Sequence, residues 1–117
     1  MHSPIGAAMQ TAIETAVGVL VIGDFVGLEK LSQGRRLTAE EIRQAVAEYG
    51  HQLVAPPSFD AMRPNVVAVA GSSPPRYSAV VDLWSADEGR SDLSLELTLV
   101  RRSTGLFDIE VDTVHVL

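Results

Sequence analysis

Residues 93–111 read LSLELTLVRRSTGLFDIEV, and this stretch decides the fold. From Leu93 to Leu99 every second residue is leucine and the residues between are polar, the two-residue period of a strand with one buried face. The run that starts at Phe107 alternates in the same way, with acidic residues between the apolar ones. The connection Ser103-Thr104-Gly105 has the length and the final glycine of a bulged hairpin turn. The stretch therefore predicts an antiparallel hairpin with two facing pairs, Leu99 with Ile109 and Leu97 with Val111.

Apolar periodicity assigns the rest of the chain to helices and strands. Apolar residues spaced by three and four, beginning at Ile5, predict three N-terminal helices, at 6–22, 24–32 and 38–49. Short apolar runs bounded by proline and glycine predict strands that precede and join the hairpin, at 51–55, 66–70, 77–86, 92–102 and 106–116. This order predicts one α+β domain over 1–117, with three helices packed on a curved antiparallel sheet of four to five strands.

Two helix starts carry strong local signals. Thr38-Ala39-Glu40-Glu41 is a capping box, in which Thr38 bonds the amide of Glu41 and Glu41 bonds back. Asp24 follows Gly23 and is suited to cap the second helix. We therefore expect the third helix to begin at residue 39 and the second to begin directly after Asp24.

Composition excludes several classes of function. Fifteen acidic and nine basic residues give a net charge of −6, and no run of basic residues offers a nucleic-acid face. The chain has no cysteine, so it needs no oxidising compartment. The apolar run 16–22 is far shorter than the roughly 20 residues that cross a bilayer. Since the N-terminus also lacks a secretory signal, we expect a cytoplasmic protein without a nucleic-acid or membrane partner.

The segment 19–28, VLVIGDFVGL, places Gly-Asp between the first two helices, and 105–109, GLFDI, lies in the last strand. Both resemble segments of the nuclear-transport-factor-2-like, or ketosteroid-isomerase-like, cone fold, although a long hairpin between the second and third helices is missing. That resemblance implies a pocket between the helices and the sheet. The segments 34–42, GRRLTAEEI, and 81–84, VDLW, more closely resemble an uncharacterised bacterial domain family, which implies no function.

Two residues are weak candidates for catalysis. Strand alternation places His115 on the core side near the end of the sheet, where an imidazole can act as a general base. Asp24 can project toward the mouth of a cone, although capping accounts for it more simply. His2, His51 and His115 lie far apart in the sequence, so we expect neither a histidine metal site nor a cofactor.

The outer face of the predicted sheet carries the main binding candidates. The predicted registers place Asp82, Glu96 and Asp112 side by side, an arrangement that suits a divalent cation, a basic partner, or simply solvent with Arg76, Arg90 or Arg102 nearby. Trp84 and Val80 share that face, and the indole either anchors a partner or is covered by Pro74-Pro75 or the 87–90 loop.

The leading interpretation is a non-enzymatic protein-binding or accessory domain, similar to small immunity proteins, that binds a partner or itself through this outer face. The alternative is a small-molecule-binding protein or an isomerase- or dehydratase-type enzyme with a pocket between helices and sheet.

Overall fold

The computed structural model describes residues 6–116 and confirms the α+β class, with the helices preceding an antiparallel sheet. The elements follow the predicted order: α1 (Ala7–Val21), α2 (Phe25–Leu31), α3 (Ala39–Tyr49), β1 (Leu53–Val54), the 3-10 turn η1 (Asp60–Met62), β2 (Asn65–Ala68), β3 (Arg76–Ser85), β4 (Gly89–Arg101) and β5 (Phe107–Val116). His2 and Ile5 lie outside the described residues. Of the expected strand at 51–55, Leu53 and Val54 form the ladder with β3.

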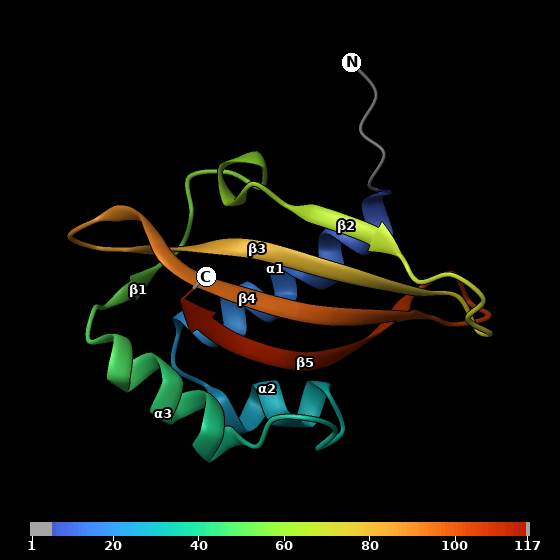
Figure 1. The fold of residues 1–117 in the computed structure, drawn as a ribbon, viewed down its shortest axis with the longest axis horizontal. Helices are drawn as coiled ribbons and strands as arrows, with labels where there is room; N and C mark the ends of the chain where they lie inside the picture. Colours follow the sequence, from blue (N-terminus) through green and yellow to red (C-terminus); the bar gives the residue numbers. More distant parts are fainter. Residues whose placement is uncertain (1–5, 117) are drawn as a thin grey trace.

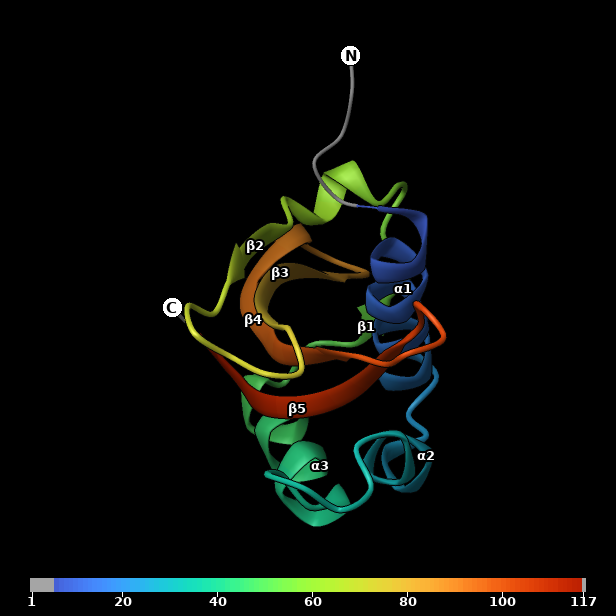
Figure 2. The same ribbon diagram turned by 90° about the vertical axis from the view of Figure 1, so that its right-hand side faces the viewer.

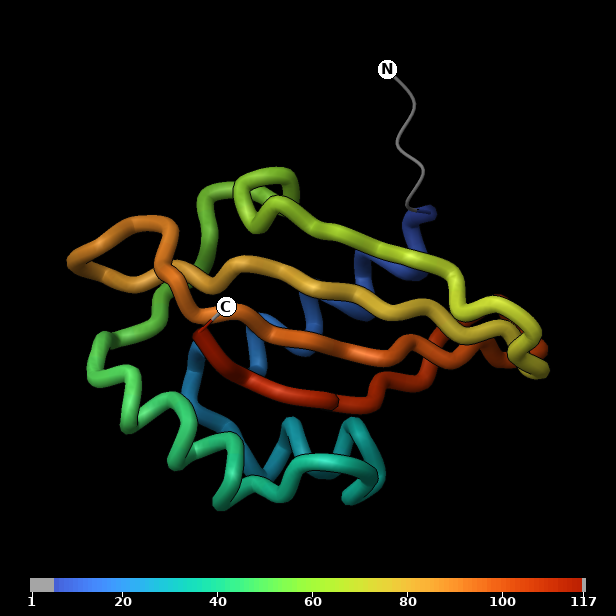
Figure 3. The backbone as a smooth tube through the Cα atoms, in the orientation of Figure 1, coloured from blue at the N-terminus to red at the C-terminus, as the bar shows by residue number. Residues whose placement is uncertain are grey.

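The five strands form one curved sheet (Figures 1 and 2). The order is β1-β3-β4-β5, and β2 pairs with β3 on the same side as β1. The hairpin register is as predicted, with Leu99 opposite Ile109 and Leu97 opposite Val111. The backbone trace in Figure 3 shows the β3–β4 turn at one end of the sheet and the β4–β5 turn at the other.

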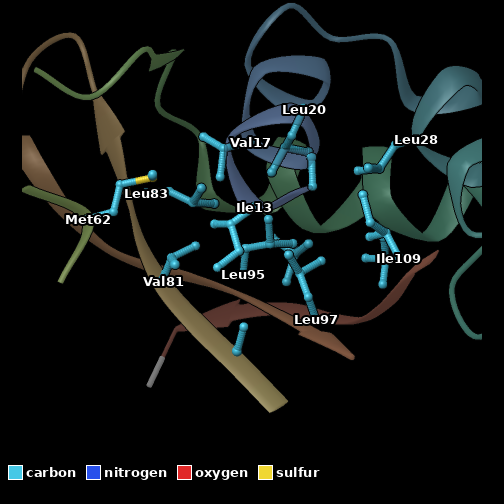
Figure 4. Packing of buried hydrophobic residues seen from close by; sticks show 14 of the residues in the cluster. Ile13, Val17, Leu20, Leu28, Met62, Val81, Leu83, Leu95, Leu97 and Ile109 are labelled. Atoms are coloured by element: carbon cyan, nitrogen blue, oxygen red, sulfur yellow. The ribbon is translucent and has the colours of Figure 1, made fainter. Parts of the chain in front are cut away.

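The core lies on the concave side of the sheet, against α1. Figure 4 shows Ile13, Val17 and Leu20 of α1 pointing toward the side chains of β3 and β4. Leu95, Leu97 and Leu99 are fully buried, as are their α1 neighbours Ile13 and Ala16. Burial of this size is the dominant stabilising contribution, at roughly 1.5–3 kcal/mol per large apolar side chain.

The helix starts follow the predicted local signals. Thr38 accepts from the Glu41 amide and the Glu41 carboxylate accepts from the Thr38 amide, which completes the capping box. Asp24 caps α2 by accepting from the Gly27 amide at 2.9 Å. Gly50 ends α3 in the left-handed conformation, with φ of 81°. Among residues 6–116, no helix has the length and hydropathy needed to cross a membrane.

Candidate functional site

The convex face of the sheet, which points away from α1, is the surface on which the sequence places its binding candidates. In Figure 1 the viewer looks onto this face, and α1 lies behind it. In Figure 2 the helices lie on the concave side and beyond β5, so none of them covers β3 and β4 from outside. Val80, Asp82 and Trp84 of β3 and Glu96 of β4 are all partly exposed.

Trp84 is held by contacts within the chain. Its Nε1 donates to the carbonyl oxygen of Ala61 at 3.2 Å, so the indole ties η1 to β3. On the other side, a side chain added at Gly89 would begin 3.5 Å from the ring. The ring is therefore covered by η1 and the β3–β4 turn, and only part of it is left for a partner.

The three outer carboxylates do not form the predicted row. Irregularities in the ladder lie between Asp82 and Trp84 and between Glu96 and Leu97, so Asp82 faces Ser94 and Glu96 faces Thr113. The prediction that these acids lie side by side was wrong because the register shifts at both irregularities. Leu83 of β3 lies opposite three residues of β4, 91–93, and Asp112 of β5 has no partner in the β4 register.

Each of these carboxylates has a basic side chain of its own as a neighbour. Asp82 lies 3.5 Å from Arg90 and 3.9 Å from Arg63. Glu96 lies 3.1 Å from His115 Nε2. Asp112 accepts from Thr98 Oγ1 at 2.7 Å and lies 3.3 Å from Arg36, which neutralises it. Local ion pairing therefore accounts for these charges without a shared cation.

The same register shift moves His115 to the convex face, where it contacts Glu96. The prediction that His115 faces the core was wrong because the extra residue at Asp112 reverses the alternation, so that Val114 is buried instead. His115 still borders a groove of about 330 Å³ between α3 and the end of β5. Asp24 is exposed and its Oδ1 already accepts from the helix, so neither candidate is arranged as a buried base.

A cluster around Glu110 was missed by sequence reasoning. The Glu110 side chain is only 7% exposed, and it lies 3.3 Å from Arg35, 3.5 Å from Arg36 and 3.7 Å from Arg76. Arg36 adopts a positive φ of 69°, uncommon outside glycine, and forms a parallel bridge with Val111 at the edge of β5. That backbone geometry brings the α2–α3 connection into contact with Glu110, which lies 75 residues after Arg35 in the sequence.

Strand β2 gives the convex face an apolar edge. Val67 is 57% exposed and Val69 is 44% exposed, although both have large apolar side chains. β2 pairs with β3 on one side, and no other described strand pairs with it. A polar groove of about 310 Å³ adjoins this edge, lined among others by Asn65, Val80 and Asp82.

A second missed cluster lies at the β3–β4 turn. His51 Nδ1 is 2.9 Å from Asp87 and 3.9 Å from Glu88. Each of these three residues offers one side-chain atom that could bind a metal ion, and the three atoms all lie within 4.8 Å of one another. The sequence offered no spacing signal for it, because His51 lies more than thirty residues before the turn.

Comparison with known proteins adds a family but no activity. No curated protein and no solved structure matches the chain. A family described as a domain of unknown function, DUF7668, matches residues 17–117, which include α2, α3 and the whole sheet. The chain therefore belongs to the DUF7668 family of domains of unknown function.

Proposed function

We propose that the chain is a non-enzymatic protein-binding domain that takes up a partner strand, in the first instance from a second copy, at the β2 edge of its convex face. The observation that carries this proposal is the combination of an open strand edge with the exposed valines Val67 and Val69. Proteins ordinarily protect such edges, because unpaired strand groups recruit other chains.

The backbone of β2 is oriented to receive a strand. The Val69 amide donates to the Arg76 carbonyl at 2.9 Å, so the amide of Val69 points toward β3. Hydrogen-bonding direction alternates along a strand in an antiparallel pair. By this alternation the N–H and C=O groups of Val66 and Ala68 point away from β3, toward the open edge, and are available for strand addition.

The β2 edge lacks two of the devices that prevent self-pairing, a charged side chain and a proline within the strand. No charged residue occurs between Asn65 and Ala70, and proline stands only before the strand, at Pro64. An antiparallel pairing of two β2 strands about their middle therefore opposes no like charges, despite the net charge of −6 of the chain. The β2 strand of a second copy can therefore pair with this edge without charge repulsion between the two strands.

The rest of the convex face supplies a polar border to this apolar edge. Val80 lies directly opposite Asn65 and continues the apolar surface from β2 onto β3. Asp82, Arg63 and Arg90 border the adjoining groove, and their ion pairs leave the side chains of both arginines about half exposed or more. An apolar centre with a charged rim is the usual composition of a protein interface.

Trp84, Glu96 and Asp112 have lesser roles in this proposal. Trp84 fixes η1, and with it the chain segment that leads into β2, while it presents the uncovered part of its ring to the same face. Glu96 and Asp112 lie on the β4 and β5 side, each with a basic side chain of its own as a neighbour. They extend the acidic surface beyond the proposed contact.

The alternative, a ligand pocket between helices and sheet, has weaker support. In the described residues the leucine-lined face is filled, with Leu95, Leu97 and Leu99 fully buried against α1. An apolar groove of about 370 Å³ does lie between α1 and the 55–59 segment, and Glu14 is the acidic residue on its border. Neither His115 nor Asp24 borders that groove, so the residues suggested for catalysis lie elsewhere.

The test compares two lysine substitutions at positions of equal exposure. Val67 on β2 and Leu106 in the β4–β5 turn are both 57% exposed. Val67→Lys places a charge on the proposed contact, and Leu106→Lys places the same charge away from it. Sedimentation equilibrium is expected to show self-association of the wild type and Leu106→Lys, and at least tenfold weaker association of Val67→Lys.

Ala68→Pro provides an independent variant, since it removes an outward N–H while the ladder to β3 is retained. It is also expected to weaken self-association, with unchanged circular dichroism. At a protein concentration of about 1 mM, a dimer with a binding free energy of only about 4 kcal/mol is still detected. A wild type that remains monomeric at this concentration therefore refutes the proposal. Equal association of Val67→Lys and Leu106→Lys refutes it as well.

A further inference from the structure

The β3–β4 turn brings one imidazole and two carboxylates together outside the proposed contact surface. Asp87 and Glu88 belong to the turn, and His51 lies between α3 and β1. His51 Nδ1 is 2.9 Å and 3.1 Å from the two oxygens of Asp87, and 3.9 Å from Glu88 Oε1. The side chains of His51 and Asp87 are 36% and 63% exposed, so an ion can reach them from solvent.

These separations match those between ligands of one small metal ion. Zinc bonds to histidine nitrogen and carboxylate oxygen at about 2.1 Å, which places neighbouring ligand atoms about 3.0–3.5 Å apart in octahedral or tetrahedral geometry. The observed distances of 2.9 Å and 3.9 Å bracket this interval. Small rotations of exposed side chains are sufficient to close the arrangement around an ion.

Four acidic residues of the sheet have an arginine neighbour that Asp87 and Glu88 lack. Asp82, Asp108, Glu110 and Asp112 each lie within 4.0 Å of an arginine. In the described part of the chain, the ion-pair neighbour of Asp87 and Glu88 is His51 alone. No arginine or lysine of the described residues lies within 4.0 Å of these two carboxylates, so no fixed cation occupies the position where a metal ion would bind.

Surrounding groups hold the carboxylates in place. The buried Ser85 hydroxyl lies 3.3 Å from Asp87 Oδ1 and donates to Glu88 Oε1 at 2.9 Å. Tyr49 at the end of α3 donates to the same Glu88 oxygen at 2.7 Å. Outer hydrogen bonds of this kind orient metal ligands and raise the affinity of a site.

We propose that His51, Asp87 and Glu88 bind a divalent transition-metal ion, with zinc as the best match to one nitrogen and two oxygen donors. The bound ion joins the end of α3 and the start of β1 to the β3–β4 turn. With three protein ligands, a coordination position remains for water or another donor. Since oxygen-rich sites are preferred by magnesium, the imidazole directs selectivity toward zinc. The site stands independently of the proposed β2 contact.

The test is calorimetric titration of the whole chain with zinc chloride, with His51→Ala, Asp87→Asn and His115→Ala as variants. His115 is a matched control, because it contacts one carboxylate, Glu96 at 3.1 Å, and no second acid. The wild type and His115→Ala are expected to bind one equivalent of zinc. His51→Ala and Asp87→Asn are expected to bind at least tenfold more weakly. Magnesium chloride is expected to give no binding heat.

Thermal unfolding with a chelator checks that the variants fold as the wild type does, and Asp87→Asn preserves the size of the side chain. Zinc is also expected to raise the melting temperature of the wild type and of His115→Ala but not of His51→Ala. No binding of zinc by the wild type at about 1 mM overturns the proposal. Equal affinity of the wild type and His51→Ala overturns it too.

Discussion

Replacing Glu110 with glutamine removes the central charge of the cluster formed with Arg35, Arg36 and Arg76. The carboxylate is nearly buried, and the three guanidinium groups lie 3.3 Å, 3.5 Å and 3.7 Å from it. Glutamine keeps the size of the side chain and leaves three arginines that repel one another. We therefore expect Glu110→Gln to destabilise the fold without changing its architecture.

The magnitude follows from the exposure of the partners. The side chains of Arg35, Arg36 and Arg76 are 55%, 53% and 38% exposed, so water screens one side of every pair. Exposed pairs contribute up to about 1 kcal/mol each, and breaking a fully buried pair costs about 3–5 kcal/mol. Three partly screened pairs around one buried acid therefore predict a loss of about 1.5–3 kcal/mol in the free energy of unfolding.

Urea unfolding of the wild type and Glu110→Gln measures this loss, with Glu40→Gln as the control. Glu40 forms an exposed pair with Arg43 one helical turn away, and such pairs contribute only about 0.3–0.5 kcal/mol. High salt is expected to shrink the effect of Glu110→Gln, because the Debye length falls to about 3 Å at 1 M. If Glu110→Gln costs no more than Glu40→Gln, the three-arginine cluster does not stabilise the fold and the reasoning is refuted.

Two further predictions concern helix capping and pH. Thr38→Ala removes the acceptor for the Glu41 amide and is expected to lower the free energy of unfolding by about 1 kcal/mol. Thr15→Ala, at an exposed position of α1, is expected to leave it nearly unchanged, and equal melting temperatures for both variants contradict the capping box. The pKa of Asp87 is lowered in the fold, chiefly by the hydrogen bond from His51, so its contribution to stability is present above the unfolded pKa and is lost as the pH falls through the folded one. In metal-free buffer the stability difference between wild type and Asp87→Asn is therefore expected to shrink as the pH falls below about 4, the ordinary pKa of an aspartate, and a difference in urea midpoint that stays constant contradicts this assignment.

Local sequence signals predicted the parts of the fold that depend on neighbouring residues. The Leu97–Val111 and Leu99–Ile109 pairs follow from the turn length and a two-residue period, and both are observed. The capping box at Thr38 needs only side chains three residues apart. These features were predictable because their energetics are settled within one hairpin or one helical turn.

The side of the sheet on which distant residues lie was not predictable in the same way. One extra residue at the β4–β5 irregularity moves His115 from the core side to the convex face. Two of the three arginines around Glu110, Arg35 and Arg36, come from the α2–α3 connection, and its left-handed residue Arg36 carries no sequence signature for that conformation. The imidazole of His51 reaches the turn carboxylates only because β1 pairs beside the end of β3.

For this protein, the sequence by itself determined the α+β class, the helix starts, the central hairpin and the identity of its buried leucines, because alternation and capping are local free-energy preferences. Only the tertiary structure decided which charges meet. Chain segments far apart in sequence are brought together by the curvature of the sheet and by single-residue shifts in register. That is why the open β2 edge, the Glu110 cluster and the His51, Asp87 and Glu88 group emerge only from the folded chain.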